Sequence, residues 1–328
     1  MVVERAGAQP LLKPWGVLDL QPWSKARHDG GAIGEIRYER AIVAAESSLL
    51  LKLLFTEQPL SIQVHPDDAL AHEMGLPRGK SEAWYILGAA PGAQVALGLD
   101  RRLTPQQLRE AIDDGSISDL VRWRTVAPDD IVVVPAGTIH AIGAGLVIAE
   151  IQQRSDTTFR LFDYGRQREL HAEQAIAAAD AGPLGPEVDL EAGLGVLANP
   201  LAEARTLLVA NVHFVFERLD LAADSAWRLD AERETWLLVV SGGARVGSFD
   251  LAPGDAVFAQ ADCTEIHPGA TGMVGLVAYT GASPLPHLLQ RAAWPSSPAT
   301  ERRQDHHVPR SLVHAKAAPT GTRLETTK

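Results

Sequence analysis

Short apolar runs alternate with turn residues over much of the chain. Two of the clearest runs are residues 48–55 (SLLLKLLF) and 82–88 (EAWYILG). Runs of this length, rich in apolar residues and bounded by Gly, Pro, Asp or Ser, are typical of antiparallel β-strands. The pattern continues from residue 33 to 99 and resumes from 130 to 162. It predicts a mainly all-β fold for this part of the chain.

Two short stretches follow a helical pattern instead. At Thr104 a good N-cap residue precedes Pro105 at the first helical position, and Leu108 and Ile112 then fall four residues apart. Capping, an N-terminal proline and this apolar spacing predict a helical insertion over about 104–123. Residues 171–177 (HAEQAIA) predict a second, short helix that ends before a Gly-Pro pair.

The second half of the chain weakly repeats the first. Residues 127–134 (APDDIVVV) compare with 252–258 (APGDAVF), within a second β-rich region. A stretch rich in Gly, Pro and Ala separates the halves, and a stretch with little periodicity ends the chain. The sequence therefore predicts tandem β-barrels. The expected parts are a first barrel over 1–180, a connector over 181–204, a second barrel over 205–288 and a flexible tail over 289–328.

Residues that bind metals gather on the strands of the first half. Gln63 and His65 are two apart, as are Lys80 and Glu82, so each pair shares one face of a strand. The apolar neighbours of these residues would face the opposite side. His140 follows a Val-rich run that is closed by a Pro-Ala-Gly turn, which places it at the start of a returning strand. We expect the polar set to point into one interior.

Two histidines and one carboxylate make a three-ligand metal set. His65, Glu82 and His140 would leave coordination positions open for water or substrate, as a catalytic zinc or similar divalent site requires. Gln63 could add a fourth ligand through its amide oxygen. A single histidine on a strand is more often hydrogen-bonded than a ligand, but burying this many polar groups without a partner would cost several kcal/mol. The convergence therefore favours a metal site.

The second half has only a partial imitation of this set. Glu265, His267 and Pro268 resemble the first motif, but no second histidine and carboxylate occur at matching offsets. We expect these residues to be structural and the second barrel to be metal-free.

Composition and charge narrow the classes of partner. Of the 328 residues 46% are apolar, and 41 acids against 30 lysines and arginines give a formal charge of −11. A general attraction to nucleic acid or to an anionic membrane is therefore not expected. Cys263 is the one cysteine of the chain, which excludes an internal disulfide framework. The chain has neither a signal-peptide pattern nor an apolar stretch long enough to span a membrane, so we expect a cytoplasmic protein.

Four motifs in order resemble the type I mannose-6-phosphate isomerases of the shorter bacterial class, which belong to the cupin superfamily. They are residues 63–66 (QVHP), 79–82 (GKSE), 135–140 (PAGTIH) and 150–166 (EIQQRSDTTFRLFDYGR). The resemblance covers most of residues 33–170. It is loose at residues 13–16 (KPWG) and absent from the tail, and we expect neither region to touch the site.

The resemblance implies cupin barrels and a zinc-dependent isomerase, an intramolecular oxidoreductase that interconverts mannose 6-phosphate and fructose 6-phosphate. It implies one zinc ion per chain on Gln63, His65, Glu82 and His140, with Arg160 in the active site. The small-molecule substrate is then a sugar phosphate.

Further roles follow from the chemistry of moving a carbonyl group between C1 and C2. Lys80 is a candidate for binding phosphate or transferring a proton, and Arg160 for holding an oxyanion or phosphate. Glu150 is a candidate base or hydroxyl acceptor, unless it forms an ion pair with Arg154. Because the chain as a whole is acidic, at least two of Lys80, Arg154, Arg160 and Arg166 should line the pocket.

Two other functions use the same ligands. Two histidines and a carboxylate also suit ferrous iron in an oxygenase, although the nearby cations fit an anionic sugar better. A non-catalytic, metal-dependent sugar-binding cupin is the second alternative. The general base, the native metal, the epimer preference and the oligomeric state stay open.

Overall fold

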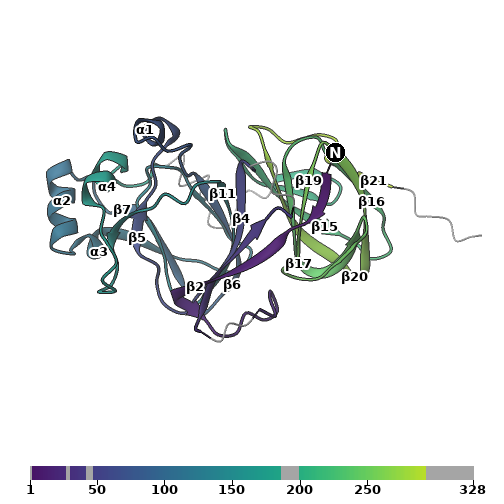
Figure 1. The fold of residues 1–328 in the computed structure, drawn as a ribbon, viewed down its shortest axis with the longest axis horizontal. Coiled ribbons are helices and arrows are strands. Elements are labelled where there is room, and N and C mark those ends of the chain that lie inside the picture. The colour runs from purple at the N-terminus through teal and green to yellow at the C-terminus, as the bar shows by residue number, and fades with distance from the viewer. Residues whose placement is uncertain (1, 27–29, 42–46, 186–198, 293–328) are drawn as a thin grey trace, which may run out of the picture. The chain divides into compact units, whose positions relative to one another are not determined.

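The computed structural model describes residues 2–26, 30–41, 47–185 and 199–292. Within these ranges the strands form three sheets in which every strand pair is antiparallel (Figure 1). Two sheets belong to the first half of the chain. One has the order β2 (Gly7–Val17), β3 (Ile33–Glu39), β4 (Leu49–Thr56), β11 (Leu146–Gln153), β6 (Glu82–Ala89) and β9 (Ile131–Val134). The other has the order β12 (Phe159–Phe162), β5 (Ile62–Val64), β10 (His140–Ile142), β7 (Gln94–Leu99) and β8 (Val121–Thr125).

These two sheets pack face to face around one interior. Trp84 and Ile86 of β6 share an apolar cluster with Val95 and Leu97 of β7. The opposite faces of both sheets are buried as well. Ile62 and Val64 lie under the helices, and Ala83 and Tyr85 face the second half of the chain. The expectation that these four side chains point away from the polar set is confirmed.

β4 shows why its sequence is an almost unbroken apolar run. All eight residues are buried, because one face lines the interior and the other packs against the second half. A strand covered on both faces has no solvent side, so it reads as continuous apolar sequence. Lys52 is the one charged residue of this strand. It is also buried, at 6% exposure, and lies on the interior face.

Three helices cover the outer face of the five-stranded sheet: α2 (Pro105–Asp113), α3 (Ile117–Leu120) and α4 (Ala172–Ala178). A further helix, α1 (Asp68–Glu73), begins three residues after His65 and lies apart from these three (Figure 1). The predicted cap of α2 is present, since the Thr104 hydroxyl accepts from the Gln107 backbone N–H at 3.2 Å. The insertion predicted over 104–123 ends earlier, because Val121 begins β8, and α1 has no counterpart in the sequence prediction. No helix in the described ranges is long and apolar enough to span a membrane.

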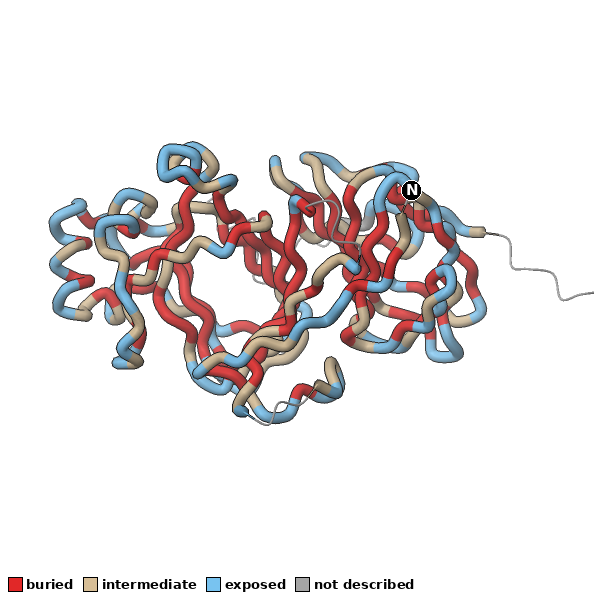
Figure 2. Tube along the Cα trace, in the orientation of Figure 1, coloured by how far each residue is buried: buried red, intermediate tan, exposed pale blue. Residues whose placement is uncertain are grey.

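The second half forms a larger sheet that encloses its own apolar core. Among the described residues its strands are β1 (Val2–Arg5), β13 (Asn199–Ala202), β14 (Arg205–Ala210), β15 (Phe214–Leu221), β16 (Trp227–Ala231), β17 (Thr235–Val246), β18 (Phe249–Leu251), β19 (Ala256–Gln260), β20 (Asp262–Thr280) and β21 (Leu289–Arg291). Figure 2 shows that buried residues follow the strands of both halves. The expectation of a mainly all-β fold is confirmed.

Two strand pairings cross the domain limits expected from the sequence. β1 comes from the N-terminus but pairs with β19 of the second half, and β21 begins within the predicted tail but pairs with β16. The halves belong to one compact unit, Met1–Ala293. The division at 180 and 205 stays a prediction. Residues 186–198 of the connector and 293–328 of the tail lie outside the described residues.

Candidate metal centre

Three predicted ligands lie together inside the first half. His65 directly follows β5, while Glu82 and His140 are the first residues of β6 and β10. Glu82 Oε2 is 3.7 Å from His65 Nε2, and Glu82 Oε1 is 3.4 Å from His140 Nε2. One ligand atom from each residue lies within 4.8 Å of the others. All three side chains are at most 1% exposed.

Hydrogen bonds to backbone carbonyls orient both imidazole rings. Nδ1 of His65 lies 2.9 Å from the Thr157 carbonyl oxygen, and Nδ1 of His140 lies 2.8 Å from that of Thr138. A carbonyl can only accept, so each Nδ1 carries the proton and each Nε2 carries the lone pair. The lone pairs face Glu82, which is the orientation that ligating histidines adopt when their other nitrogen is fixed by a carbonyl.

The protonation states also fit a cation. Burial lowers the pKa of His65 well below its usual value and that of His140 to about 4, so both rings are neutral at pH 7. Burial raises the pKa of the Glu82 carboxyl to about 7. His65 Nε2 and Glu82 Oε1 are buried without a hydrogen-bond partner among the described residues, and Glu82 Oε2 has the Lys80 ammonium at 3.1 Å. A divalent ion would supply the partner that the first two atoms lack.

Gln63 lies beside this cluster in the same sheet. It is paired with His140 across β5 and β10, and its amide nitrogen is 3.3 Å from His140 Nε2. Its amide oxygen accepts from the Ser61 hydroxyl at 3.2 Å. Rotation of the amide by 180° would turn the oxygen toward the cluster, where it could serve as a fourth ligand.

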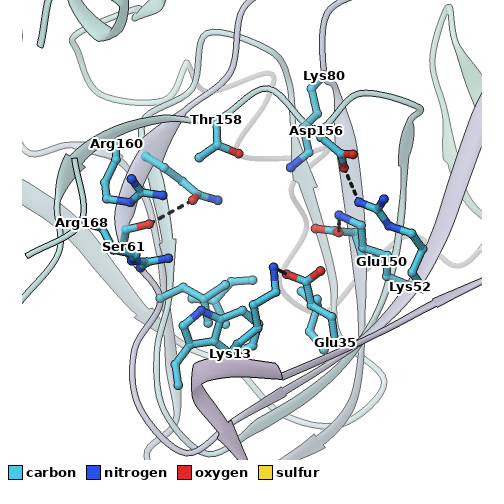
Figure 3. A pocket seen from close by; sticks show the side chains of 16 residues that line it. Lys13, Glu35, Lys52, Ser61, Lys80, Glu150, Asp156, Thr158, Arg160 and Arg168 are labelled. Atoms are coloured by element: carbon cyan, nitrogen blue, oxygen red, sulfur yellow. Dashed lines mark hydrogen bonds and ion pairs between the residues drawn. The ribbon is translucent and has the colours of Figure 1, made fainter. Parts of the chain in front are cut away.

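A cavity of about 330 Å³ opens beside the cluster, and it is lined in part by Gln63 and Lys80, which contact His140 and Glu82. Its charged walls are shown in Figure 3. Its cations are Lys13, Arg37, Lys52, Lys80, Arg160 and Arg168, and its carboxylates are Glu35, Glu150 and Asp156. The prediction that at least two of the four named cations line the pocket is confirmed by Lys80 and Arg160. Arg154 and Arg166 instead bind Glu39 at 3.0 Å and Asp163 at 2.9 Å.

Most of the cavity cations have a carboxylate of their own. Lys13 pairs with Glu35 at 2.9 Å, Lys52 with Glu150 at 3.2 Å and Lys80 with Glu82 at 3.1 Å. Arg37 pairs with Asp156. These pairs leave the wall formed by Arg160 and Arg168 as the cationic side of the cavity.

That wall carries more positive than negative charge. Arg168 and Arg166 both bind the Asp163 carboxylate, at 2.6 and 2.9 Å. Arg160 donates to the Glu169 carbonyl at 2.7 Å, and its buried Nε has no hydrogen-bond partner within the described part of the chain. Burial and the nearby Arg168 lower the pKa of Arg160. A wall of this kind favours an anion in front of it.

Glu150 lies across the cavity from that wall (Figure 3). Its Oε2 pairs with Lys52, and its Oε1 accepts from the Trp84 indole N–H at 3.2 Å. The alternative of an ion pair between Glu150 and Arg154 is wrong, because Arg154 binds Glu39. Burial alone would raise the pKa of Glu150, but Lys52 and Lys80 outweigh burial and lower it. Glu150 is therefore ionised at neutral pH.

Sequence reasoning missed several residues of the cavity. Lys13 and Trp15 line it, so the expectation that the loosely matching residues 13–16 do not touch the site is wrong. Lys52 and Arg168 were also missed. Lys52 could have been found, because it is a single lysine inside an eight-residue apolar strand. Burying an unpaired charge costs free energy, so a lysine at such a position indicates a buried partner or a function. Arg168 comes from an irregular segment and gave no such signal.

Fold and site together define a class: tandem cupin-like β-structures with a buried His, His and Glu set beside a cationic cavity. No family model matches the chain. It is 40% identical over 162 residues to the mannose-6-phosphate isomerase ManA of Bacillus subtilis, covering 47% of this chain and 48% of the relative. It is 41% identical over 140 residues to the mannose-6-phosphate isomerase of Streptococcus mutans, covering 41% and 44%. The matched part thus spans about half the length of these curated relatives.

Solved structures extend the likeness to the whole fold. The mannose 6-phosphate isomerase of Bacillus subtilis superposes with a TM-score of 0.71 at 24% identity, covering 84% of this chain and 98% of that one. A mannose 6-phosphate isomerase bound with zinc and yttrium superposes with a TM-score of 0.64 at 16% identity, covering 85% and 99%. The chain therefore has the cupin-like phosphomannose isomerase fold.

Proposed function

We propose that the protein interconverts mannose 6-phosphate and fructose 6-phosphate, with one zinc ion per chain held by His65, Glu82 and His140 and by Gln63 as a fourth ligand. The observation that carries the proposal is the buried ligand set beside a cavity with a cationic wall, with His65 Nε2 and Glu82 Oε1 lacking hydrogen-bond partners within the described ranges. The names of the relatives, at about 40% identity, support the same activity.

The cavity walls suit the two ends of a sugar phosphate. A bound divalent ion would supply Lewis-acid stabilisation for negative charge on the sugar oxygens. Arg160 and Arg168 would hold the phosphate, since guanidinium groups bind phosphate oxygens in bidentate geometry. Lys80 extends from the ligand segment into the cavity and would donate to a sugar oxygen.

Proton transfer between C1 and C2 needs a base near the reacting carbons. Glu150 is the best placed carboxylate, because Lys52 and Trp84 fix both of its oxygens while it lines the cavity. Its lowered pKa keeps it ionised and ready to accept a proton at neutral pH.

A coupled isomerase assay tests the activity, with metal-loaded protein and with protein stripped by a chelator. We expect turnover that depends on the metal, and incorporation of deuterium at carbon when the reaction runs in heavy water. Oxygen uptake with iron and without isomerisation would favour the oxygenase. Tight binding of the sugar phosphate without turnover would favour the binding protein.

The phosphate assignment has its own test. Arg160→Ala should lose much more activity on the phosphorylated sugar than on the free sugar, whereas Lys80→Ala should affect both. Arg166→Ala is the matched control, because Arg166 is a nearby arginine that binds Asp163 but does not line the cavity. Equal losses on the two sugars for Arg160→Ala would contradict a phosphate site at that wall.

A further inference from the structure

The segment before Glu82 is held at every backbone N–H. Gly79 N donates to the Asp68 carboxylate at 2.7 Å, and Lys80 N donates to the Pro66 carbonyl at 3.0 Å. Ser81 N donates to the Gln153 amide oxygen at 2.9 Å. Residues 79–81 are not part of a strand, so these bonds replace the pairing that would otherwise fix their position.

Two of these acceptors are linked to each other. The Gln153 amide nitrogen donates to Asp68 Oδ1 at 3.0 Å, so one carboxylate oxygen accepts from both Gly79 and Gln153. The Gln153 backbone N–H also donates to the Ser81 carbonyl at 3.1 Å. Gln153 is 6% exposed. Asp68 and Gln153 thus form a continuous brace around residues 79–81.

The brace joins the chain segments that carry two different ligands. Asp68 lies three residues after His65, and Gly79 lies three residues before Glu82. The two segments are in close contact at Gly79, where a Cβ atom would lie 2.5 Å from the Asp67 carbonyl carbon. The distance between His65 and Glu82 therefore depends on the bonds that hold these segments together.

We propose that Asp68 and Gln153 are positioning residues, which hold Lys80 and Glu82 against His65 so that the ligand set is formed before the metal binds. The inference rests on the proposed metal site. Neither residue lines the cavity or belongs to the ligand cluster. Loss of a hydrogen bond to a ligand side chain itself typically changes metal affinity 10- to 100-fold, so loss of a bond to the adjacent backbone should have an effect at the lower end of that range.

Removal of either side chain should weaken metal binding. Asp68→Ala and Gln153→Ala should each lower the zinc affinity of the stripped protein about tenfold, measured by competition with a chromophoric chelator. The double variant should lose less than the product of the two, because the residues share one bond. Asp68→Asn keeps an acceptor for the Gly79 N–H and should restore most of the affinity.

Asp67→Ala is the matched control. Asp67 is the adjacent carboxylate and caps α1 by accepting from Leu70 N at 2.8 Å, but it does not bind residues 79–81. It should lower the melting temperature without changing zinc affinity. If Asp68→Ala and Gln153→Ala lower the affinity no more than Asp67→Ala, the brace is merely structural and the proposal is wrong.

The readout separates this proposal from the proposed function. Zinc affinity is measured on stripped protein without substrate. If the wild type binds zinc but does not isomerise sugars, the proposed function is wrong. The comparison of zinc affinities among the variants then still decides whether Asp68 and Gln153 position the ligands. A wild type that binds no divalent ion overturns both. The Asp68 side chain is 44% exposed, which favours folded variants. If Gln153→Ala does not fold, Asp68→Ala compared with Asp68→Asn and Asp67→Ala decides the question.

Discussion

Each half of the molecule buries a cluster of polar side chains, and the two clusters differ in how their atoms are partnered. In the first half His65, Glu82 and His140 converge, and His65 Nε2 and Glu82 Oε1 have no hydrogen-bond partner in the described ranges. In the second half Arg205 and Glu217 are equally buried, at 2% and 0% side-chain exposure. Burial therefore does not distinguish a functional cluster from a structural one.

The polar groups of the second cluster are hydrogen-bonded to one another. Arg205 Nε and Nη2 each donate to a Glu217 oxygen at 2.8 Å, and the Tyr279 hydroxyl also donates to Glu217. The Tyr279 oxygen in turn accepts from Leu285 N at 3.0 Å. A buried pair with this geometry has no capacity left for a ligand. Partnerless atoms beside a cavity are thus the feature that singles out the first cluster.

The largest effect is expected from Glu82. Glu82→Gln removes the one negative charge of the ligand set, so we expect loss of bound metal and a fall in kcat of about a thousandfold or more, comparable to removal of a key stabilising group. Glu82→Gln also leaves the buried Lys80 ammonium without the carboxylate that lies 3.1 Å from it, so the stripped variant should be less stable than stripped wild type. Metal content, kcat and the thermal unfolding of both stripped proteins are the measurements. Bound metal and kcat that survive the substitution would contradict a ligand role for Glu82.

Breaking the second cluster should lower stability without affecting the metal. Glu217→Ala leaves the Arg205 charge buried and unpaired, which typically costs about 3–5 kcal/mol and would lower the melting temperature by roughly 10 °C. Metal content and kcat of the folded protein should be unchanged. The paired replacement Arg205→Met with Glu217→Leu is the control, and it should recover much of the stability because no charge remains buried. Loss of metal in Glu217→Ala would contradict a purely structural role.

The sequence predicted the fold class and the ligand cluster, but not the walls of the cavity. Strand alternation is a local property, so Gln63 with His65 and Lys80 with Glu82 could be assigned to shared faces from spacing alone. Lys13, Arg37 and Arg168 reach the cavity from segments distant in sequence, and their places depend on how the two sheets meet. The β1 to β19 pairing was missed for the same reason, because a four-residue strand carries no signal of which half it joins.

A smaller effect on kcat is expected from a substitution of Lys52 in the first half. Its ammonium pairs with Glu150 and donates to Gln152 at 2.7 Å. Lys52→Met would remove one of the charges that lower the pKa of Glu150, so burial would raise that pKa. The acid limb of the pH profile of kcat should then move to higher pH, with kcat at pH 7 lower by about 10- to 100-fold.

Lys13→Met is the matched control for this shift. Lys13 lines the same cavity, but its partner is Glu35 rather than Glu150. Its removal should leave the acid limb where it is in wild type. If both substitutions move the limb equally, the titrating group is not Glu150, and the proton transfer belongs to another residue.

The smallest effect is expected where the second half imitates the ligand motif. Glu265 Oε2 lies 2.9 Å from His267 Nε2, and both residues are on β20. The Glu265 side chain is 69% exposed. Water already solvates this carboxylate, so the pair should contribute no more than about 0.5 kcal/mol. Glu265→Gln should therefore change neither metal content nor kcat, and should move the melting temperature by only about 1–2 °C. Loss of a metal ion on this substitution would mean that an exposed carboxylate beside a histidine can bind metal as the buried set does. Buried atoms without partners would then no longer distinguish the metal site of the first half from the second half.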